Sequence, residues 1–592
     1  MTGTAGLVAG MTAVAACAGI LGVPAPVNVA HRQPGFVQII AHPDDDLLFM
    51  SPDLPHDIRA GGGATTVVLT AAEGRAGIKP DTHNTLAYAA ERRQGLHAAY
   101  AAMAGMRDSW RIQAVRSGRV KVELHSLTGR PAIQLAFLSL PDGRDPRANL
   151  GRRALAQIHA DRDSKMCART VTPTGSPYAS CYTRKDVVGA LVTLLRRSKA
   201  TAVRAQDPAP DRRYTADHTD HAAASAFAAE AVRASGRRMV EVDYRDYNLS
   251  DMPVNLDRAD SSTKQQIFGR YRAHDYRINP EAANYGSWQE RMRYRWPRGT
   301  SWATRMPDGR PQAFAVLSGG LYTWWNSPSG WKGPAALGGG PLAPSLAVGG
   351  GQVFALRDGQ VVAARPLLSH GKWSARWTTV GSGAAGAPVV TAGRGGRPVV
   401  FVRDPKGGVS VKCQASGGSW PKKWLQLRGP AGRDVQDGMA AVGGSAGVEL
   451  FAPTRTQVLQ WRQTSACGFT YAGAIPGVRP GSPLNASRDA GGHPTLVYED
   501  GGLTTVRQVQ ETGRTWTTPT RRLGAVFERT GEAPVPTGGT MPPALGVPAI
   551  GVPIVAAYGN GKAAALALGA DGRMYVSARG TWGTFGAWQP AG

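Results

Sequence analysis

Cysteine is scarce in this chain, which has only five among 592 residues. No Cys-x-x-Cys pair is present, and its absence argues against a cysteine zinc site. Cys17 falls in an apolar N-terminal segment, so four cysteines remain in the body of the chain. An even number fits an oxidising compartment, and the most local pairing joins Cys167 with Cys181 and Cys413 with Cys467. Four buried free thiols are the alternative.

Acidic residues are also few, because 42 Asp and Glu stand against 68 Lys and Arg, a formal charge of +26. Such an excess of positive charge is a common feature of proteins that bind nucleic acid. However, the basic residues are mainly scattered arginines, and no nucleic-acid fold signature occurs, so we expect no nucleic-acid partner. An arginine-rich compositional bias, or attraction to an anionic envelope or polymer, accounts for the charge instead.

The N-terminus lacks the basic residues that usually open an export signal. Residues 5–23 are nevertheless apolar and rich in small side chains, and Pro24 and a small-residue stretch follow. We therefore predict an export segment over residues 1–30 and a secreted or envelope-associated protein. A transmembrane anchor and a lipid anchor at Cys17 are the alternatives.

The first half of the chain alternates strand-like and helix-like segments. At 592 residues the chain is too long for one core, so at least two domains are expected. Apolar strand-like runs lie at residues 37–41, 65–70, 133–140, 201–205 and 239–242, and helix-like runs at 85–104, 185–197 and 222–234. This alternation predicts an α/β Rossmann-like layered domain with a mostly parallel sheet.

Two polar motifs stand out in that half. Ala41-His42-Pro43-Asp44-Asp45-Asp46 follows the first apolar strand, where an α/β fold keeps its ligand sites. Three carboxylates at a buried strand end need a cation or a hydrogen-bond network to offset their desolvation. Asp217-His218-Thr219-Asp220-His221 opens the alanine-rich helix. Either motif alone could be an ordinary turn or surface pair, but together they predict a metal site.

The two motifs resemble those of the PIG-L, or LmbE-like, family of metal-dependent de-N-acetylases, which read Ala-His-Pro-Asp-Asp-Glu and His-Pro-Asp-His. Asp46 stands in place of the family's Glu and Thr219 in place of its Pro, and neither position is a family metal ligand. The resemblance covers roughly the first 280 residues.

The resemblance implies a complete site. The metal ligands would be His42, Asp45 and His221, holding Zn²⁺ or another divalent metal that activates water and polarises an acyl oxygen. Asp44 would be the general base. A protonated His218 would stabilise the oxyanion, with Asp220 as its carboxylate partner. The alternative for Asp220 is a carboxylate that only favours the helix N-terminus.

Composition changes after an aromatic connector at residues 288–309. Glycine and tryptophan become frequent, helix signals vanish, and short apolar strands alternate with Asp/Gly turns at a period of roughly 45 residues. Residues 310–592 therefore predict an all-β propeller of six or seven blades, following a deacetylase domain at 31–287. Its pattern resembles tectonin-like and fucose-lectin-like propellers. The repeated tryptophans could stack on sugars or pack neighbouring blades together, and packing is the usual role of such residues.

These observations predict a secreted zinc-dependent deacetylase acting on an N-acetylglucosamine-type sugar or glycoconjugate. The propeller would target it to carbohydrate or to an envelope polymer by raising local concentration. A separable targeting module would be dispensable for turnover of a small soluble substrate. The alternatives are a carbohydrate-binding or adhesive protein with an inactive deacetylase scaffold, and an amidase acting on a thiol or lipid glycoconjugate.

Overall fold

A computed structural model gives the fold of this chain. It describes residues 35–143, 154–168, 180–279, 283–297, 302–430, 434–444, 447–481, 483–488, 491–499, 506–513, 515–518, 520–521, 545, 547–550, 554–557, 563–580 and 584–592. The predicted export segment and Cys17 lie outside these residues. No helix in the described part of the chain is long and apolar enough to cross a membrane.

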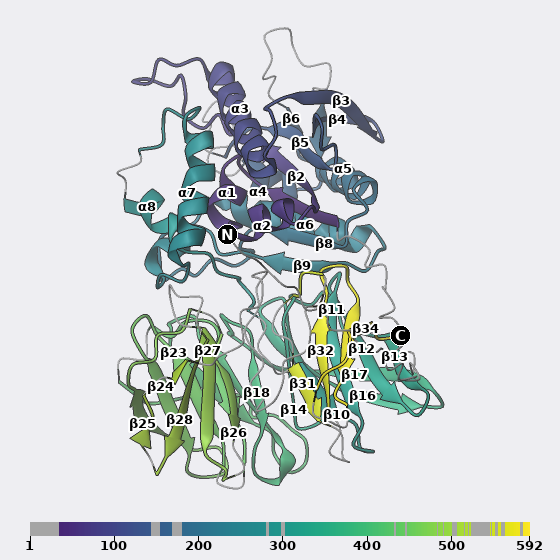
Figure 1. The fold of residues 1–592 in the computed structure, drawn as a ribbon, viewed down its shortest axis with the longest axis vertical. Helices are drawn as coiled ribbons and strands as arrows, with labels where there is room; N and C mark the ends of the chain where they lie inside the picture. Colours follow the sequence, from purple (N-terminus) through teal and green to yellow (C-terminus); the bar gives the residue numbers. More distant parts are fainter. Residues whose placement is uncertain are drawn as a thin grey trace, which may run out of the picture. The chain divides into compact units, whose positions relative to one another are not determined.

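The N-terminal half is built on one seven-stranded sheet (Figure 1) in the order β3-β4-β5-β2-β1-β8-β9. The strands are β1 (Gly35–Ile40), β2 (Gly63–Thr70), β3 (Trp110–Ser117), β4 (Val120–Leu127), β5 (Ile133–Leu140), β8 (Ala202–Ala205) and β9 (Val240–Asp243). β5, β2, β1, β8 and β9 pair in parallel, whereas β3, β4 and β5 pair antiparallel. The predicted mostly parallel sheet is confirmed, and the antiparallel β3–β4 hairpin is an addition to it.

Helices cover both faces of this sheet, as the alternation predicts. They are α1 (Asp45–Phe49), α2 (Asp53–Arg59), α3 (Thr85–Ala104), α4 (Ala154–Ala160), α5 (Arg184–Arg197), α6 (Thr219–Ala234), α7 (Arg258–Arg272) and α8 (Ala283–Gln289). Val37 and Ile39 of β1 pack in one core with α4, α5 and α6. Ile40 packs in a second core with α1, α3 and α7. The strand alternation therefore divides the apolar side chains between two helical layers.

Strand order reverses at β1, and this point locates the site. The chain runs from β1 to β2 on one side, and later places β8 on the other side of β1. At such a switch point the loops after the two strands diverge and leave a crevice for ligands. The loop after β1 contains His42, and the segment between β8 and α6 contains His218.

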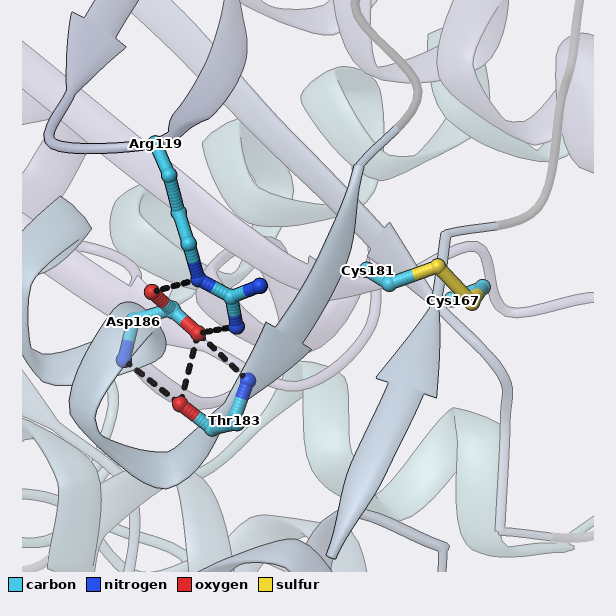
Figure 2. The surroundings of a disulfide bond; sticks show 5 residues. All are labelled: Arg119, Cys167, Cys181, Thr183 and Asp186. Atoms are coloured by element: carbon cyan, nitrogen blue, oxygen red, sulfur yellow. Dashed lines mark hydrogen bonds and ion pairs between the residues drawn. A yellow bond between two sulfur atoms is a disulfide. The ribbon is translucent and has the colours of Figure 1, made fainter.

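Two disulfides confirm the predicted cysteine pairing. Cys167 of β6 (Lys165–Cys167) is bonded to Cys181 of β7 (Cys181–Thr183), and Cys413 is bonded to Cys467. Figure 2 shows the first bond beside the start of α5, where Thr183 and Asp186 form a capping box. Arg119 donates from Nε to Asp186 over 2.9 Å, which ties the β3–β4 turn to this helix.

Within its described residues, the C-terminal half forms six small antiparallel sheets, in agreement with the predicted all-β propeller. The first three are β10 (Ala303–Arg305), β11 (Pro311–Leu317), β12 (Gly320–Ser327) and β13 (Gly330–Gly338); β14 (Leu346–Gly349), β15 (Gln352–Arg357), β16 (Gln360–Ser369) and β17 (Lys372–Ser382); and β18 (Val389–Ala392), β19 (Pro398–Arg403), β20 (Val409–Cys413) and β21 (Leu425–Gln426).

The other three are β22 (Ala440–Val442), β23 (Glu449–Pro453), β24 (Val458–Gln463) and β25 (Phe469–Ile475); β26 (Asn485–Arg488), β27 (Pro494–Glu499), β28 (Val506–Thr512), β29 (Thr515–Trp516) and β30 (Thr520–Arg521); and β31 (Ile554–Ala557), β32 (Ala563–Leu568), β33 (Met574–Ala578) and β34 (Gln589–Pro590). The first strands of neighbouring sheets contact each other, from β10 through β14, β18 and β22 to β26. β31 contacts β10, so the last sheet returns to the first.

Tryptophans join neighbouring blades. Trp377 donates from Nε1 to the carbonyl of Leu337 over 3.1 Å. Trp461 makes the same kind of bond to the carbonyl of Arg428 over 2.8 Å. These indoles pack one blade on the next, which is the packing role that the sequence favours for a single tryptophan.

The two halves share one hydrophobic cluster within the compact unit formed by Arg32–Gly592. Phe36 of β1 and Val240 of β9 belong to this cluster together with Trp302, Ala313 and Leu566 of the first and last blades. Buried ion pairs add to it, since Arg403 donates from Nη1 to Asp211 over 2.5 Å. A separate hydrophobic cluster at the contact between the two domains therefore joins the propeller to the α/β domain.

Candidate metal and catalytic site

Three side chains from the two motifs converge at the carboxyl end of β1. His42 Nδ1 lies 3.2 Å from His221 Nε2, and Asp45 Oδ1 lies 3.2 Å from the same nitrogen. The remaining side of the triangle, from His42 Nδ1 to Asp45 Oδ2, measures 3.3 Å. All three residues are buried, so their lone pairs face one small volume that water reaches poorly. Two imidazole nitrogens and a carboxylate oxygen are a donor set typical of catalytic zinc.

Local structure fixes each of these residues. The chain turns directly from β1 into the short helix α1, and the His42 backbone N–H donates to Asp45 Oδ2 over 2.6 Å. His221 lies in the first turn of α6, where His218 is the N-cap residue. Thr219 occupies the first helical position, which tolerates proline because its N–H has no partner within the helix. Thr219 in place of proline therefore removes no hydrogen bond from the helix.

Carboxylates behind the two histidines orient them. Asp217 Oδ1 accepts from His221 Nδ1 over 2.7 Å, which leaves Nε2 as the nitrogen with a lone pair toward the cluster. His42 Nε2 faces Asp142 Oδ2 at 3.6 Å and Asp220 Oδ2 at 3.7 Å. Both imidazoles thus have a carboxylate on the side away from the converging atoms, as metal-ligating histidines usually do.

The acidic surroundings favour positive charge in this volume. Burial lowers the pKa of His42, but Asp45, Asp220 and Asp142 more than offset burial and raise it to about 10. Burial also disfavours charge on His221, and Asp45 with Asp217 again raises its pKa well above the usual value. Burial raises the pKa of Asp45, whereas the two imidazoles lower it well below the normal range. A cation bound among these groups would meet the same attraction that holds the protons.

Asp44 lies beside this cluster and faces a cavity. Burial raises the pKa of Asp44, and Asp45 acts in the same direction, although the Arg92 guanidinium opposes both. Arg92 of α3 donates from Nη2 to Asp44 Oδ1 over 2.7 Å and from Nη1 to the Ala72 carbonyl over 2.8 Å. The carboxylate is thus held in one position and its basicity is raised above that of an exposed aspartate.

His218 and Asp220 are neighbours at the start of α6. His218 Nδ1 accepts from the backbone N–H of Asp220 over 3.2 Å, so the neighbour orients this ring through its amide. The Asp220 carboxylate accepts from the Gly143 N–H over 2.8 Å, and its Oδ2 lies 3.7 Å from both His218 Nδ1 and His42 Nε2. With Nδ1 used as an acceptor, the ring proton sits on Nε2. His218 can therefore donate a hydrogen bond without being protonated on both nitrogens.

Asp46, the other departure from the family motif, faces away from the cluster. Its carboxylate accepts hydrogen bonds from Tyr100 and Thr66 in the core beneath β2. Burial raises the pKa of Asp46 to about 7, although the Tyr100 hydrogen bond opposes the shift. This residue supports the start of α1 and takes no part in the converging set.

A cavity of about 280 Å³ opens next to the cluster. His42, Asp44, Asp45 and His218 line it, together with Asp142, Arg75, Arg277 and the aromatic side chains of Tyr88, Tyr247, Tyr285 and Trp288. Tyr247 stacks on Trp288 with ring centroids 5.0 Å apart, which forms a flat aromatic wall. Converging polar groups with an aromatic wall are typical of a site for a small polar ligand such as a sugar.

Sequence reasoning missed Asp217, Asp142 and Arg92. Asp217 had a signal, because it lies four residues before His221 at the start of a helix, where side chains meet. Asp142 follows β5 as His42 follows β1, so the same strand-end argument could have found it. Nothing in the local sequence distinguishes Arg92 from Arg93, the other arginine of α3.

This geometry defines a buried, metal-competent site on an α/β domain that is joined to a propeller. Residues 37–232 match the family model described as PIG-L, GlcNAc-PI de-N-acetylase. This match falls in the N-terminal α/β part of the chain and agrees with the resemblance of its two motifs. No curated protein sequence matches the chain.

Similar solved structures cover either half. The BP39L lectin from Burkholderia pseudomallei is 17% identical, over 49% of this chain and 83% of that chain, with a TM-score of 0.33. The fucose-specific lectin from Aleuria aurantia is 12% identical, over 50% of this chain and 96% of that chain, with a TM-score of 0.30. The N,N'-diacetylchitobiose deacetylase from Pyrococcus horikoshii is 15% identical, over 41% of this chain and 70% of that chain, with a TM-score of 0.25.

Proposed function

We propose that this protein is a metal-dependent deacetylase that hydrolyses the N-acetyl amide of an N-acetylglucosamine-type sugar or glycoconjugate. One observation carries the proposal: His42, Asp45 and His221 converge within 3.3 Å of one another beside a cavity lined by Asp44. The match to the de-N-acetylase family model supports the same reaction. Secretion, with the propeller holding the enzyme on carbohydrate or envelope polymer, completes the proposal.

The donor set fits the proposed metal. His42 Nδ1, Asp45 and His221 Nε2 would hold Zn²⁺ or another divalent ion, because these atoms face one another and the opposite ring nitrogens face carboxylates. When bound there, such an ion would polarise an acyl oxygen and lower the pKa of water. Three protein ligands would leave such an ion able to take water or substrate as well.

Asp44 would carry the protons of the reaction. Its carboxylate lines the cavity and would take a proton from the attacking water, then deliver a proton to the leaving amine. Arg92 keeps Asp44 in place through the 2.7 Å bond to Oδ1. The raised pKa of this carboxylate, caused by burial, makes it a better base than an exposed aspartate.

His218 would stabilise the oxyanion. The Asp220 amide occupies Nδ1, so Nε2–H is the donor available to a negative oxygen in the cavity. The aromatic wall of Tyr247 and Trp288 would cover an apolar face of the sugar ring.

The Asp44→Asn variant tests this assignment. We expect acetate release from N-acetylglucosamine derivatives to fall by about 10²–10⁴-fold, because the isosteric amide cannot accept the proton. Metal content should stay at the wild-type level, since Asp44 is not among the converging atoms. Asp163→Asn, an exposed position, is the matched control and should keep full activity. Loss of metal in Asp44→Asn would make that carboxylate a ligand and overturn its role as base.

The competing function is a carbohydrate-binding protein with an inactive deacetylase scaffold. An amidase that acts on thiol or lipid glycoconjugates is a variant of the proposed deacetylase. Acetate release separates the scaffold from the enzyme. A panel that includes N-acetylated glycoconjugates of each kind separates the substrates.

A further inference from the structure

A second cavity, of about 460 Å³, lies in the propeller between the second and third blades. Strands β16 and β17 supply one wall, and β20 with the segment before β21 supplies the other. Its lining includes Lys412, Lys422, Lys423, Trp420 and Trp424. None of the described residues that line this cleft is acidic, so three ammonium groups share it without a carboxylate among them.

Lys412 is the unusual member. The residue is only 2% exposed. Its ammonium nevertheless donates only to backbone carbonyls, those of Val380 over 2.7 Å and Lys422 over 3.3 Å. An ammonium has three donors, so one donor is left for the cleft that Lys412 lines. A buried ammonium without an anionic partner is costly, and an anion entering the cleft would offset that cost.

Neighbouring residues hold the ammonium in place. Lys412 Nζ lies 5.0 Å from the centroid of the Trp424 ring, within the range of a cation–π contact. Trp424 is itself fixed, because Nε1 donates to the Ser382 carbonyl over 2.9 Å. Gly381 leaves the room that this arrangement needs, since a Cβ there would lie 2.8 Å from Lys412 Nζ. The cation and the indole thus form a built site between two blades.

We propose that this cleft binds an acidic polysaccharide, with its carboxylates or phosphates on the lysines and a sugar ring against the tryptophans. Charge-assisted hydrogen bonds suit the ammonium groups, and indole surface suits the apolar face of a pyranose. Thr379, Ser382 and Gln360 line the same cleft and can bond to sugar hydroxyls. The choice of a polysaccharide over a single-stranded nucleic acid rests on the proposed function, because the other domain has a site for a sugar amide.

The test measures binding by the full-length Asp44→Asn variant, so that turnover plays no part. Affinity electrophoresis in gels containing polygalacturonate, phosphorylated dextran or neutral dextran gives a dissociation constant for each polymer. The two acidic gels distinguish carboxylate from phosphate as the anionic group. We expect retardation in at least one acidic gel and none in neutral dextran.

Charge-matched variants separate the site from the general charge of +26. Lys422→Glu/Lys423→Glu should weaken binding at least tenfold. Lys372→Glu/Lys406→Glu carries the same charge change on exposed residues of the same two blades, outside the cleft, and should stay within about twofold of the parent. Lys412→Met keeps the shape of the side chain without its charge, and should also weaken binding tenfold with an unchanged melting temperature.

Four results would overturn the proposal: no retardation in either acidic gel, equal loss in both charge-matched pairs, equal retardation in neutral dextran, or lysine-dependent binding of an oligo-dT strand without binding of acidic polysaccharide. Acetate release by the wild-type protein is scored separately. Failure of that reaction with intact polymer binding would refute the deacetylase and leave the cleft standing.

Discussion

Asp217 is the residue whose role the structure changes most. The sequence marks it only as the acidic neighbour of His218, whereas the fold places its Oδ1 2.7 Å from His221 Nδ1. Such a carboxylate fixes the tautomer and raises the basicity of a ligating imidazole. The Oδ2 atom of Asp220, predicted to be the carboxylate partner of His218, lies 3.7 Å from His218 Nδ1 and also 3.7 Å from His42 Nε2. Each proposed ligand histidine therefore has a carboxylate partner that the motif alone could not assign.

Replacing Asp217 by Asn should weaken metal binding by about 10–100-fold, the usual effect of losing such a partner. Competition with a chromophoric chelator measures the dissociation constant for Zn²⁺ in the full-length protein. Asp163→Asn, which changes the charge equally at an exposed position, should leave the constant unaltered. An unchanged affinity in Asp217→Asn would show that Asp217 does not support a ligand.

At the scale of elements, the sequence predicts the framework well. The predicted strand at residues 133–140 and helix at 85–104 coincide with β5 and α3, because a continuous apolar run and a run rich in strong helix formers are local signals. The β3–β4 hairpin was not predicted, since Trp110–Ser117 is mostly exposed and lacks an apolar run. Antiparallel edge strands of this kind depend on their partner, here β5, rather than on their own composition.

The cap of α5 offers a test at this scale. Burial raises the pKa of Asp186, but hydrogen bonds from Arg119 and Thr183 outweigh burial and lower it to about 2. A carboxyl with a depressed folded-state pKa stabilises the fold above its unfolded pKa and loses that effect as the pH falls toward the folded value. Its contribution should therefore be constant near neutrality and decline below about pH 4.

Asp186→Ala should lower the free energy of unfolding by about 1–2 kcal/mol at pH 7, since it removes a helix cap and an ion pair. Urea denaturation of both proteins at pH 7 and pH 3 measures the difference, which should shrink at the lower pH. Asp163→Ala, at an exposed position outside the helices, serves as the control. A difference that grows on acidification would contradict the assigned direction of the pKa shift.

At the scale of the whole molecule, the shared core changes the view of the propeller. A separable targeting module was expected, but Phe36 and Val240 of the central sheet pack with Trp302 and Leu566 of the blades. Arg245, only 1% exposed, pairs with Asp207 on one side and with Asp437 of the propeller on the other. This contact between domains could not be read from either half of the sequence, because it depends on how two folded surfaces meet.

The same network reaches the site. Asp207 donates its backbone N–H to Asp246 Oδ2 over 2.9 Å, and that carboxylate oxygen lies 3.7 Å from His221 Nδ1. The propeller residue Asp437 is thus connected to the surroundings of a proposed ligand through Arg245 and Asp207. Removal of the propeller should disturb the site as well as expose apolar surface.

A chain truncated after Pro297 should therefore lose solubility and release acetate from a small soluble substrate at least tenfold more slowly than the full chain. Size-exclusion chromatography and a rate measurement on the soluble fraction report both effects. Asp437→Asn is the milder companion, and should lower metal affinity without loss of the propeller. A truncated chain that is monomeric and fully active would contradict this prediction and support the propeller as a separable targeting module.

The central claim is that one metal ion, held by His42, Asp45 and His221, makes this domain a deacetylase. The most direct measurement is acetate release from an N-acetylglucosamine derivative while Zn²⁺ is titrated into chelator-treated full-length protein. We predict negligible release without metal, a linear rise as metal is added, and a plateau at one equivalent per chain. Release that survives chelation unchanged, or a protein that takes up one equivalent and releases no acetate from any N-acetylated substrate tested, would contradict it.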